Sequence, residues 1–113
     1  MKIYHNPRCK KSRTGLAHLQ TKTSDIQIVT YLSDAPFTEE SLKAVLTKLG
    51  KSPLEMCRKQ EAAFKEHIKG KDLSDNELIR LMAENPKLIN RPIIETDTHA
   101  VWGDPPSEID SLF

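Results

Sequence analysis

A cysteine near the start of the chain, Cys9, has neighbours that favour a reactive thiol. It lies in the run His5-Asn6-Pro7-Arg8-Cys9-Lys10-Lys11-Ser12-Arg13, just before a stretch that predicts a helix. The unpaired N–H groups of a helix N-terminus and the four cations of this run would both stabilise a thiolate. Thiolates are nucleophiles, and the same N–H groups can bind an oxyanion. We therefore predict that Cys9 is the nucleophile of a redox or oxyanion enzyme.

Three further side chains have two interpretations each. Ser12 follows Cys9 by about one helical turn, so its hydroxyl would either hydrogen-bond the thiolate or lie on the helix surface. His5 would be a proton shuttle or charge partner, or an inert histidine at a strand end. The second cysteine, Cys57, would either resolve an oxidised Cys9 or serve in packing.

The composition excludes several classes of protein. With 17 Lys and Arg against 16 Asp and Glu, the net charge of +1 lacks the basic excess typical of a nucleic-acid binder. No apolar run approaches the roughly 20 residues that span a membrane, and no secretory signal is expected. The two cysteines therefore predict reduced thiols in the cytoplasm, and the histidines show no metal-ligand spacing with them, so no metal site is expected.

Apolar periodicity and turn residues predict the elements that must position Cys9. Strands are expected at 1–4, 25–31 (mostly buried), 92–95 and 99–102, the last two forming a hairpin. Helices are expected at 9–20, 38–49 and 61–68, from a capping box at 74–77 to residue 85, and shortly after residue 105.

This order, β-α-β … β-β-α with a cysteine at the start of the first helix, is the layout of a thioredoxin-like domain. We predict an α/β fold with a four-stranded mixed sheet, a single domain over 1–113 and a helical insertion at about 38–84. Ser12 stands where the second cysteine of a Cys-x-x-Cys pair would be, so the arrangement is monothiol.

Three segments resemble the glutaredoxin-linked arsenate reductase family. The run from His5 to Arg13 is similar to the active-site loop of that family. Cys57-Arg58-Lys59-Gln60 is similar to its Leu-Arg-Lys-Asn segment, and 88–94 matches its Ile-Asn-Arg-Pro-Ile-Val block nearly letter for letter. The three blocks occur in the same order and at similar spacing over residues 4–108.

The resemblance implies a site and a reaction. Arg58 and Arg91 would bind the oxyanion above Cys9, because a guanidinium fork suits a tetrahedral anion. Arg13 and Pro92 would support the site, and the Arg91–Pro92 peptide bond would be cis. The substrate would be arsenate or a related oxyanion, with glutathione as co-substrate and glutaredoxin as reductant, and no bound cofactor would be needed.

Two alternative functions remain open. One follows from a difference between this sequence and the family pattern, and the other from a second group of proteins with the same fold. Better-known members of the family have a third arginine near the position of Asp104, so the chain would instead be a glutathione-dependent reductase of another substrate. The same fold also serves Spx-type regulators that bind RNA polymerase and sense redox state through a Cys-x-x-Cys pair. Ser12 removes that pair and counts against this second alternative.

Overall fold

The computed structural model describes residues 1–33 and 35–113, which divide into two compact units. The first unit, called here the sheet unit, combines Met1–Ala35 with Arg91–Phe113. The second, the helical unit, is the continuous segment Pro36–Asn90. The expectation that both belong to a single domain stays a prediction, and each unit is described by itself.

The sheet unit has four short strands in the order β2-β1-β3-β4. Its elements along the chain are β1 (Lys2–Tyr4), α1 (Lys10–Gln20), β2 (Gln27–Val29), β3 (Ile93–Glu95), β4 (Ala100–Trp102) and the 3₁₀-helix η3 (Pro106–Leu112). β1 pairs in parallel with β2 and antiparallel with β3, and β3 pairs antiparallel with β4. The predicted mixed sheet and its hairpin are therefore present.

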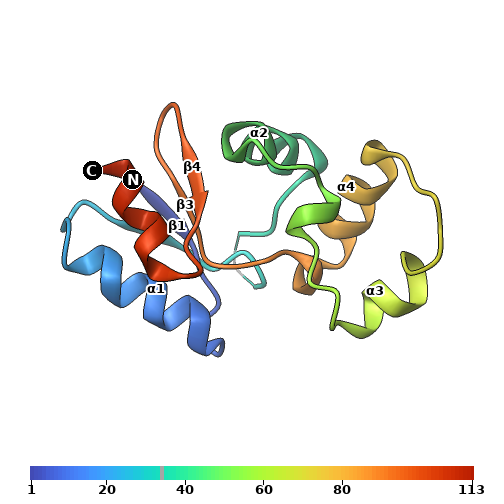
Figure 1. Cartoon of the computed structure of the whole chain (residues 1–113), viewed down its shortest axis with the longest axis horizontal. Helices are drawn as coiled ribbons and strands as arrows, with labels where there is room; N and C mark the ends of the chain where they lie inside the picture. Colours follow the sequence, from blue (N-terminus) through green and yellow to red (C-terminus); the bar gives the residue numbers. More distant parts are fainter. Residues whose placement is uncertain (34) are drawn as a thin grey trace. The chain divides into compact units, whose positions relative to one another are not determined.

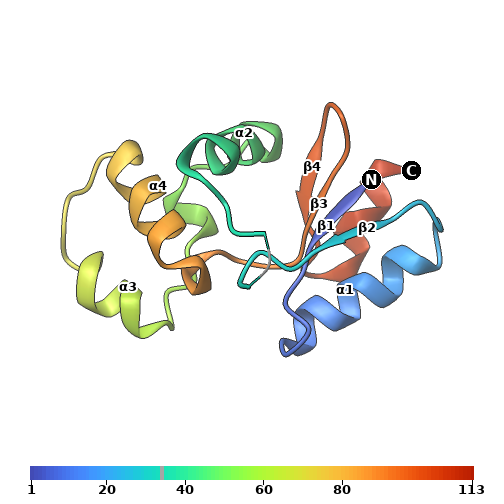
Figure 2. The same cartoon turned by 180° about the vertical axis from the view of Figure 1, so that it is seen from behind.

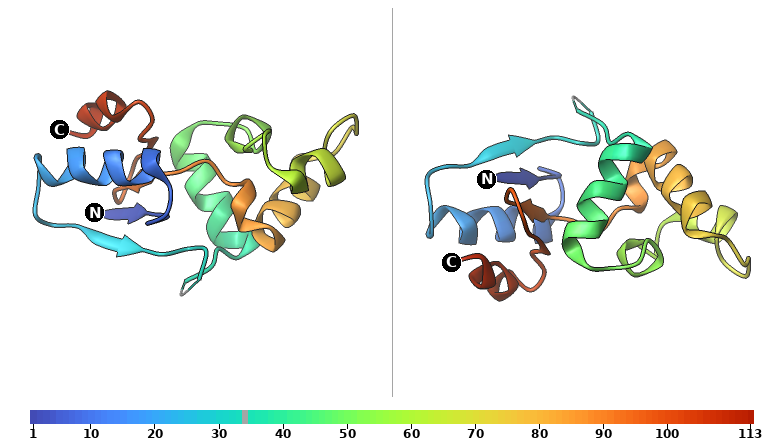
Figure 3. Two further views of the ribbon diagram at one scale, coloured as in Figure 1. Left: turned by 90° about the horizontal axis from the view of Figure 1, so that it is seen from below. Right: turned by 90° about the horizontal axis from the view of Figure 1, so that it is seen from above.

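One face of this sheet carries the core of the unit. Ile3 and Ile94 are directly opposite each other on β1 and β3, so they share a face. Both are fully buried, together with Leu19 of α1 and Ile109 of η3. Burial of each side chain stabilises the fold by about 1.5–3 kcal/mol. α1 (blue in Figures 1 and 3) and η3 (red) thus pack on the same face of the sheet, the face that carries Ile3 of β1. β1 is the strand that leads to Cys9.

The prediction of a long, mostly buried second strand is wrong. β2 covers only Gln27–Val29, Gln27 is exposed, and 49% of the Ile28 surface remains accessible. The reason is its place at the edge of the sheet (Figure 2), where one side has no neighbouring strand. An apolar, β-branched run does not distinguish a central strand from an edge strand.

The helical unit contains α2 (Glu39–Leu49), η1 (Leu54–Met56), α3 (Ala62–His67), α4 (Asp75–Glu84) and η2 (Pro86–Leu88). α2 and α4 contact each other and lie side by side (Figure 2), and Leu42, Val45 and Leu46 of α2 are buried. On α4 the buried residues are Leu78, Ile79 and Met82, whereas Leu81 is only partly buried.

The predicted ends of these helices are largely confirmed. The Thr38 hydroxyl accepts a hydrogen bond from the N–H of Ser41, and Gly50 ends α2 at a φ of 67°, a conformation that glycine adopts without strain. Ser74 caps α4 by accepting from the N–H of Glu77. The reciprocal half of the predicted capping box is replaced, because the Glu77 carboxylate accepts from the Ser74 hydroxyl instead.

Candidate active site

Cys9 is the N-cap residue of α1, at the end of a tightly bonded loop. Its own N–H donates to the Asn6 carbonyl at 3.0 Å, and its carbonyl accepts the first helical hydrogen bond, from Arg13. The Asn6 side chain accepts from the N–H of Arg8 at 3.1 Å, and the Arg13 guanidinium donates to the Pro7 carbonyl at 3.0 Å. The loop between β1 and α1 is therefore held at several points, and Cys9 is partly exposed at its end.

The surroundings of Cys9 favour its thiolate. Partial burial by itself raises the pKa of the thiol, but the N–H groups of Ser12 and Lys11 and the side chain of Arg91 outweigh it, so the pKa of Cys9 lies below its ordinary value. The sulfur does not meet the geometry of a side-chain cap, yet these N–H groups are near enough to stabilise its charge. A lowered pKa increases the thiolate fraction at neutral pH.

The four cations next to Cys9 in sequence are not the source of this effect, contrary to our expectation. None of their side-chain charges is among the causes that lower the pKa of Cys9; Lys11 contributes only through its backbone N–H, and the charged neighbour of the thiol is Arg91. All four side chains are exposed, and water screens exposed charges. Two are also engaged elsewhere, because Arg13 donates to the Pro7 carbonyl and Lys11 pairs with Asp104 at 3.2 Å.

Ser12 and His5 form a buried pair, which neither interpretation of Ser12 anticipates. Ser12 is fully buried, so it is not on the helix surface. Its Oγ lies 2.7 Å from Nδ1 of His5 and accepts a hydrogen bond from the N–H of Asn6 at 3.0 Å. His5 is 6% exposed, and burial together with the charge of Arg13 lowers its pKa. The ring is therefore neutral at neutral pH.

Arg91 and Pro92 lie at the same end of the sheet as the Cys9 loop, because Ile93, which follows them, pairs with Tyr4; Pro92 also approaches α1 closely. The Arg91–Pro92 peptide bond is cis, as expected from the resemblance, and Arg91 is 9% exposed. The indole of Trp102 donates to the Arg91 carbonyl at 3.3 Å, and the N–H of Gly103 donates to the Pro92 carbonyl at 2.8 Å. These bonds tie the segment before β3 to the end of β4.

Gly15 makes this approach possible. A Cβ atom at this position would lie 2.5 Å from Cγ of Pro92 and 3.3 Å from the Gly103 carbonyl oxygen. Glycine in a helix interior costs about 1 kcal/mol relative to alanine, so its presence there indicates a close packing contact. The signal was in the sequence, but our interpretation did not use it.

Asp104 is not an unpaired charge beside the nucleophile. Its carboxylate lies 3.2 Å from Nζ of Lys11, in the first turn of α1, and 26% of its side chain is exposed. The acid therefore compensates a cation of the loop run. Asp104 and Lys11 are far apart in sequence, and no local pattern indicated that they would pair.

The other two predicted residues, Arg58 and Cys57, belong to the helical unit. Cys57 pairs with Ile89 in an isolated antiparallel bridge, and the N–H of Asn90 donates to the Met56 carbonyl at 2.9 Å. The backbone around Arg58 is therefore bonded to the segment that leads into Arg91. Nη1 of Arg58 is buried and lies 3.5 Å from a carboxylate oxygen of Glu61 without forming a hydrogen bond. The role of Arg58 in oxyanion binding stays a prediction.

Cys57 is a packing residue by its surroundings. It is 4% exposed, and burial raises the pKa of its thiol to about 11, although the charge of Lys59 opposes this. A protonated thiol is a poor nucleophile. Its interpretation as a resolving cysteine is therefore not supported within the helical unit.

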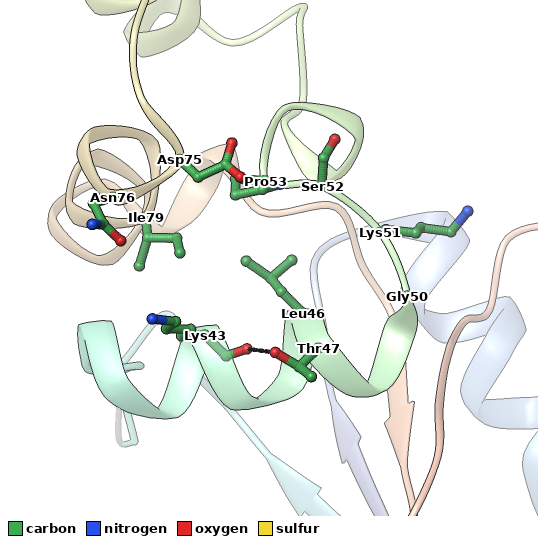
Figure 4. Close-up of a pocket in the computed structure, with 10 residues that line it drawn as sticks. All are labelled: Lys43, Leu46, Thr47, Gly50, Lys51, Ser52, Pro53, Asp75, Asn76 and Ile79. Atoms are coloured by element: carbon green, nitrogen blue, oxygen red, sulfur yellow. Dashed lines mark hydrogen bonds between the residues drawn. The ribbon is translucent and has the colours of Figure 1, made fainter.

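A separate hollow of about 440 Å³ lies in the helical unit between α2 and the start of α4 (Figure 4). Leu46 and Ile79 point into it, and Lys43 and Asp75 lie at its sides. Its lining contains no cysteine or histidine. Over residues 1–33 and 35–113, no cluster of three or more metal-ligating side chains occurs, and no helix has the length and apolar character to cross a membrane.

The mixed four-stranded sheet with a thiol at the start of its first helix defines a thioredoxin-like α/β fold, which confirms the predicted fold class. The ArsC family model matches residues 4–112. The chain belongs to the ArsC family, which confirms the resemblance inferred from the three segments.

Relatives and solved structures agree with this assignment. The chain is 39% identical to the uncharacterized protein YfgD of Escherichia coli, covering 96% of this chain and 92% of that one. It is 35% identical to an arsenate reductase of Neisseria meningitidis, covering 99% of this chain and 97% of that one. The structure of an arsenate reductase from Vibrio cholerae superposes with a TM-score of 0.91 at 39% identity, covering 100% and 98% of the two chains.

Proposed function

We propose that this protein is a thiol-dependent oxidoreductase that reduces arsenate. The observation that carries the proposal is the position of Cys9 at the N-cap of α1, with its pKa lowered by backbone N–H groups and by Arg91. Membership of the ArsC family and the arsenate reductase of Neisseria meningitidis support arsenate as the oxyanion. Both cysteines are free thiols, which fits the reducing cytoplasm that the proposal assigns to the protein.

The proposed reaction has three steps. The Cys9 thiolate attacks arsenic, an As–O bond breaks, and the oxygen leaves as water after protonation. A glutathione thiolate then attacks Sγ of Cys9, so that an S–S bond forms, the S–As bond breaks and its electron pair reduces As(V) to As(III), which leaves as arsenite. Finally a glutaredoxin thiolate attacks the glutathione sulfur of the mixed disulfide and releases the Cys9 thiolate. Glutathione and glutaredoxin together supply the two electrons.

The residues of this chain supply binding and charge. The guanidinium of Arg91 would neutralise the oxyanion as Cys9 attacks, and the N–H groups of Lys11 and Ser12 would stabilise negative charge at the same end of α1. We assign a second oxyanion contact to Arg58, whose buried Nη1 has an unused hydrogen-bonding position among the described residues. No step requires a metal or a bound organic cofactor.

The test is an assay of arsenate-dependent NADPH oxidation coupled through glutathione, glutaredoxin and glutathione reductase. We expect turnover by the wild-type protein and by Cys57→Ser, because Cys57 is buried and protonated. We expect none by Cys9→Ser, since an alcohol at this position does not ionise. Arsenate-dependent turnover that is equal in wild type and Cys9→Ser would reject the proposal.

The reductant is tested in the same assay. Replacement of glutathione and glutaredoxin by thioredoxin and thioredoxin reductase should abolish turnover, because the proposed mixed disulfide contains glutathione. Equal rates with the two reducing systems would contradict the glutathione step. They would indicate that the reductant protein exchanges directly with the Cys9 adduct.

The pairing of Asp104 with Lys11 favours a second candidate, a glutathione-dependent reductase of protein mixed disulfides. This pair removes one free cation from the first turn of α1, where an arsenate anion would benefit from it. The variant Asp104→Arg separates the candidates. A higher arsenate turnover in this variant indicates that the missing cation limits arsenate reduction, whereas an unchanged rate argues that Asp104 does not set the substrate.

The sequence of the Cys9 loop argues against an RNA polymerase-binding redox regulator. Such a regulator requires a disulfide between positions 9 and 12, and the chain has only two cysteines, Cys9 and Cys57. The residue at position 12 is a serine whose hydroxyl is engaged by His5 and Asn6.

A further inference from the structure

The indole of Trp102 binds the residue that supplies charge to Cys9. Trp102 is the last residue of β4, and its Nε1–H donates to the Arg91 carbonyl at 3.3 Å. The Arg91 side chain in turn lowers the pKa of Cys9 through a hydrogen bond and through its charge. Trp102 is partly buried and Arg91 is 9% exposed, so water has little access to the bond between them. One hydrogen bond therefore connects the end of β4 to the side chain that activates the thiol.

The Arg91 carbonyl is the group through which a hydrogen bond can orient the peptide between Arg91 and Pro92. A peptide bond that precedes proline has no N–H, so only its carbonyl oxygen can take part in a hydrogen bond. The next peptide is also held, because the N–H of Gly103 donates to the Pro92 carbonyl at 2.8 Å. The Pro92 ring lies against Gly15 of α1, where an added Cβ atom would be 2.5 Å from Cγ of the proline. Trp102 and Gly103 thus hold two successive peptide groups.

Trp102 also has a packing role, which does not need the indole N–H. It is directly opposite Ile93 of β3, which is 1% exposed, so the two side chains are neighbours on one face of the sheet. An aliphatic or phenyl side chain could make the same apolar contact, because such a contact requires no donor. The indole differs from these side chains by its N–H, which is a donor only. A test of the hydrogen bond must therefore remove the N–H without changing the shape of the ring.

We propose that Trp102 is a positioning residue, whose indole N–H fixes the Arg91 carbonyl and thereby holds the Arg91 guanidinium beside Sγ of Cys9. The carbonyl carbon is bonded to Cα of Arg91, so the orientation of this peptide sets the direction in which the Arg91 side chain leaves the main chain. A guanidinium held in one position stabilises the thiolate more than one that moves among several. The inference rests on the proposed function, because it concerns the charge that activates Cys9, and it gives Trp102 no contact with the substrate.

The test replaces the indole N–H alone. The chain contains a single tryptophan, so a tryptophan analogue incorporated during expression changes only position 102. In 3-benzothienylalanine a sulfur atom takes the place of the N–H, and the two fused rings are retained. The packing against Ile93 is therefore kept and the hydrogen bond to Arg91 is lost. The readout is the pKa of Cys9 from the pH dependence of alkylation by iodoacetamide, which requires neither arsenate nor glutathione.

We expect the analogue to raise the pKa of Cys9 by about half a pH unit, because the loss of one ordinary hydrogen bond changes an equilibrium constant by a few-fold. Trp102→Phe, which also lacks the donor, should raise it at least as much. An unchanged Cys9 pKa in the analogue protein would overturn the proposal, since the position would then require only an apolar ring.

The same measurement in an Arg91→Met background shows whether Trp102 acts through Arg91. Arg91→Met alone should raise the Cys9 pKa more than the analogue does, and the analogue should add nothing in this background, because the guanidinium is already absent. A rise of equal size in both backgrounds would mean that Trp102 acts on Cys9 by another route, and would overturn the proposal. If Arg91→Met itself leaves the pKa unchanged, the basis of the proposed function fails as well, whereas an unchanged pKa with the analogue alone rejects only the role of Trp102.

A measurement on the unmodified protein keeps the proposal falsifiable if the substituted proteins do not fold. The single tryptophan gives one indole N–H signal in the NMR spectrum of a ¹⁵N-labelled sample. We expect this proton to exchange with water far more slowly than that of a free indole, because it is bonded to the Arg91 carbonyl and partly buried. Exchange at the rate of a free indole would show that the hydrogen bond is absent and would overturn the proposal.

Discussion

The ionisation of Cys9 depends on a residue that is distant in sequence. Arg91 contributes both a hydrogen bond and a charge to the thiolate, whereas the cations adjacent to Cys9 face solvent. Water and salt screen an exposed charge strongly and a buried charge much less. The charge density of a short segment is therefore a poor guide to the charge felt by a side chain within it.

Arg91→Met should raise the pKa of Cys9 towards the value of a free thiol, about 8.5. Methionine retains the length of the stem and removes the charge and the hydrogen bonds. Alkylation rates at several pH values measure the change. Arg8→Met is the matched control, because Arg8 is next to Cys9 in sequence but exposed. An equal shift in the two variants would mean that the neighbouring cations matter after all.

The two cysteines should differ sharply in reactivity. In the native protein at pH 7.5, iodoacetamide should modify Cys9 and leave Cys57 intact, because burial keeps the pKa of Cys57 at about 11. Peptide mass spectrometry assigns the label, and urea should make both cysteines reactive. Cys57→Ala should leave the alkylation of Cys9 unchanged and lower the free energy of unfolding by about 1 kcal/mol. Rapid native labelling of Cys57 would contradict its assignment as a packing residue.

At the scale of elements, the sequence predicted where helices begin and end better than it predicted which strand lies at the edge of the sheet. Thr38, Gly50 and Ser74 mark helix ends through their own side chains or backbone freedom, so the sequence alone was sufficient for them. The exposure of Ile28 depends on which strand occupies the edge of the sheet, and that is decided by pairing between distant segments. The burial of Ser12 likewise depends on packing between two elements, since its side chain contacts His5 at the end of β1.

The last element, η3, is attached to α1 by a carboxylate that makes stability depend on pH. Asp110 lies 2.7 Å from Nε2 of His18 and 3.6 Å from Nζ of Lys22. The hydrogen bond with His18, and then the charge of Lys22, lower the pKa of Asp110 below its ordinary value. A carboxyl group with a lowered pKa in the folded state stabilises the fold above its unfolded pKa, near 3.9, and loses this contribution as the pH falls through the folded value.

Asp110→Asn should therefore be less stable than the wild type at pH 7. The difference should begin to shrink below about pH 4 and disappear in stronger acid, where the wild-type carboxyl group is also protonated. Urea unfolding over this pH range gives the two curves. Asp97→Asn, in the exposed turn between β3 and β4, is the control and should show no such convergence. A difference that persists undiminished in acid would show that the pairing is not electrostatic.

At the scale of the whole molecule, one unit is built from a single chain segment and the other from two. The helical unit is one segment of chain, whereas the sheet unit needs both ends, because β1 pairs with β2 on one side and with β3 on the other. The core of the sheet unit is likewise shared, with Ile3 and Leu19 from the first part and Ile94 and Ile109 from the last. Neither part has a complete core without the other.

A chain that ends at Asn90 should therefore lose the sheet unit and the activation of Cys9 together. β1 would retain only its pairing with β2, and a two-stranded sheet is at best marginally stable. Arg91 would also be absent. The expected result is a Cys9 pKa near 8.5, measured by alkylation, with residual helical signal in far-UV circular dichroism. A lowered Cys9 pKa in this shortened chain would show that residues 91–113 are not required.

The discontinuity of the sheet unit has a consequence for the protein during its own synthesis. The ribosome releases Cys9 early, but the strands and the guanidinium that complete its surroundings leave the exit tunnel only after the entire helical unit. Until then Cys9 is an ordinary thiol on a nascent chain, mostly protonated at neutral pH and slow to react with oxidants. The order of translation thus delays the appearance of the reactive thiolate until residues 91–113 have emerged.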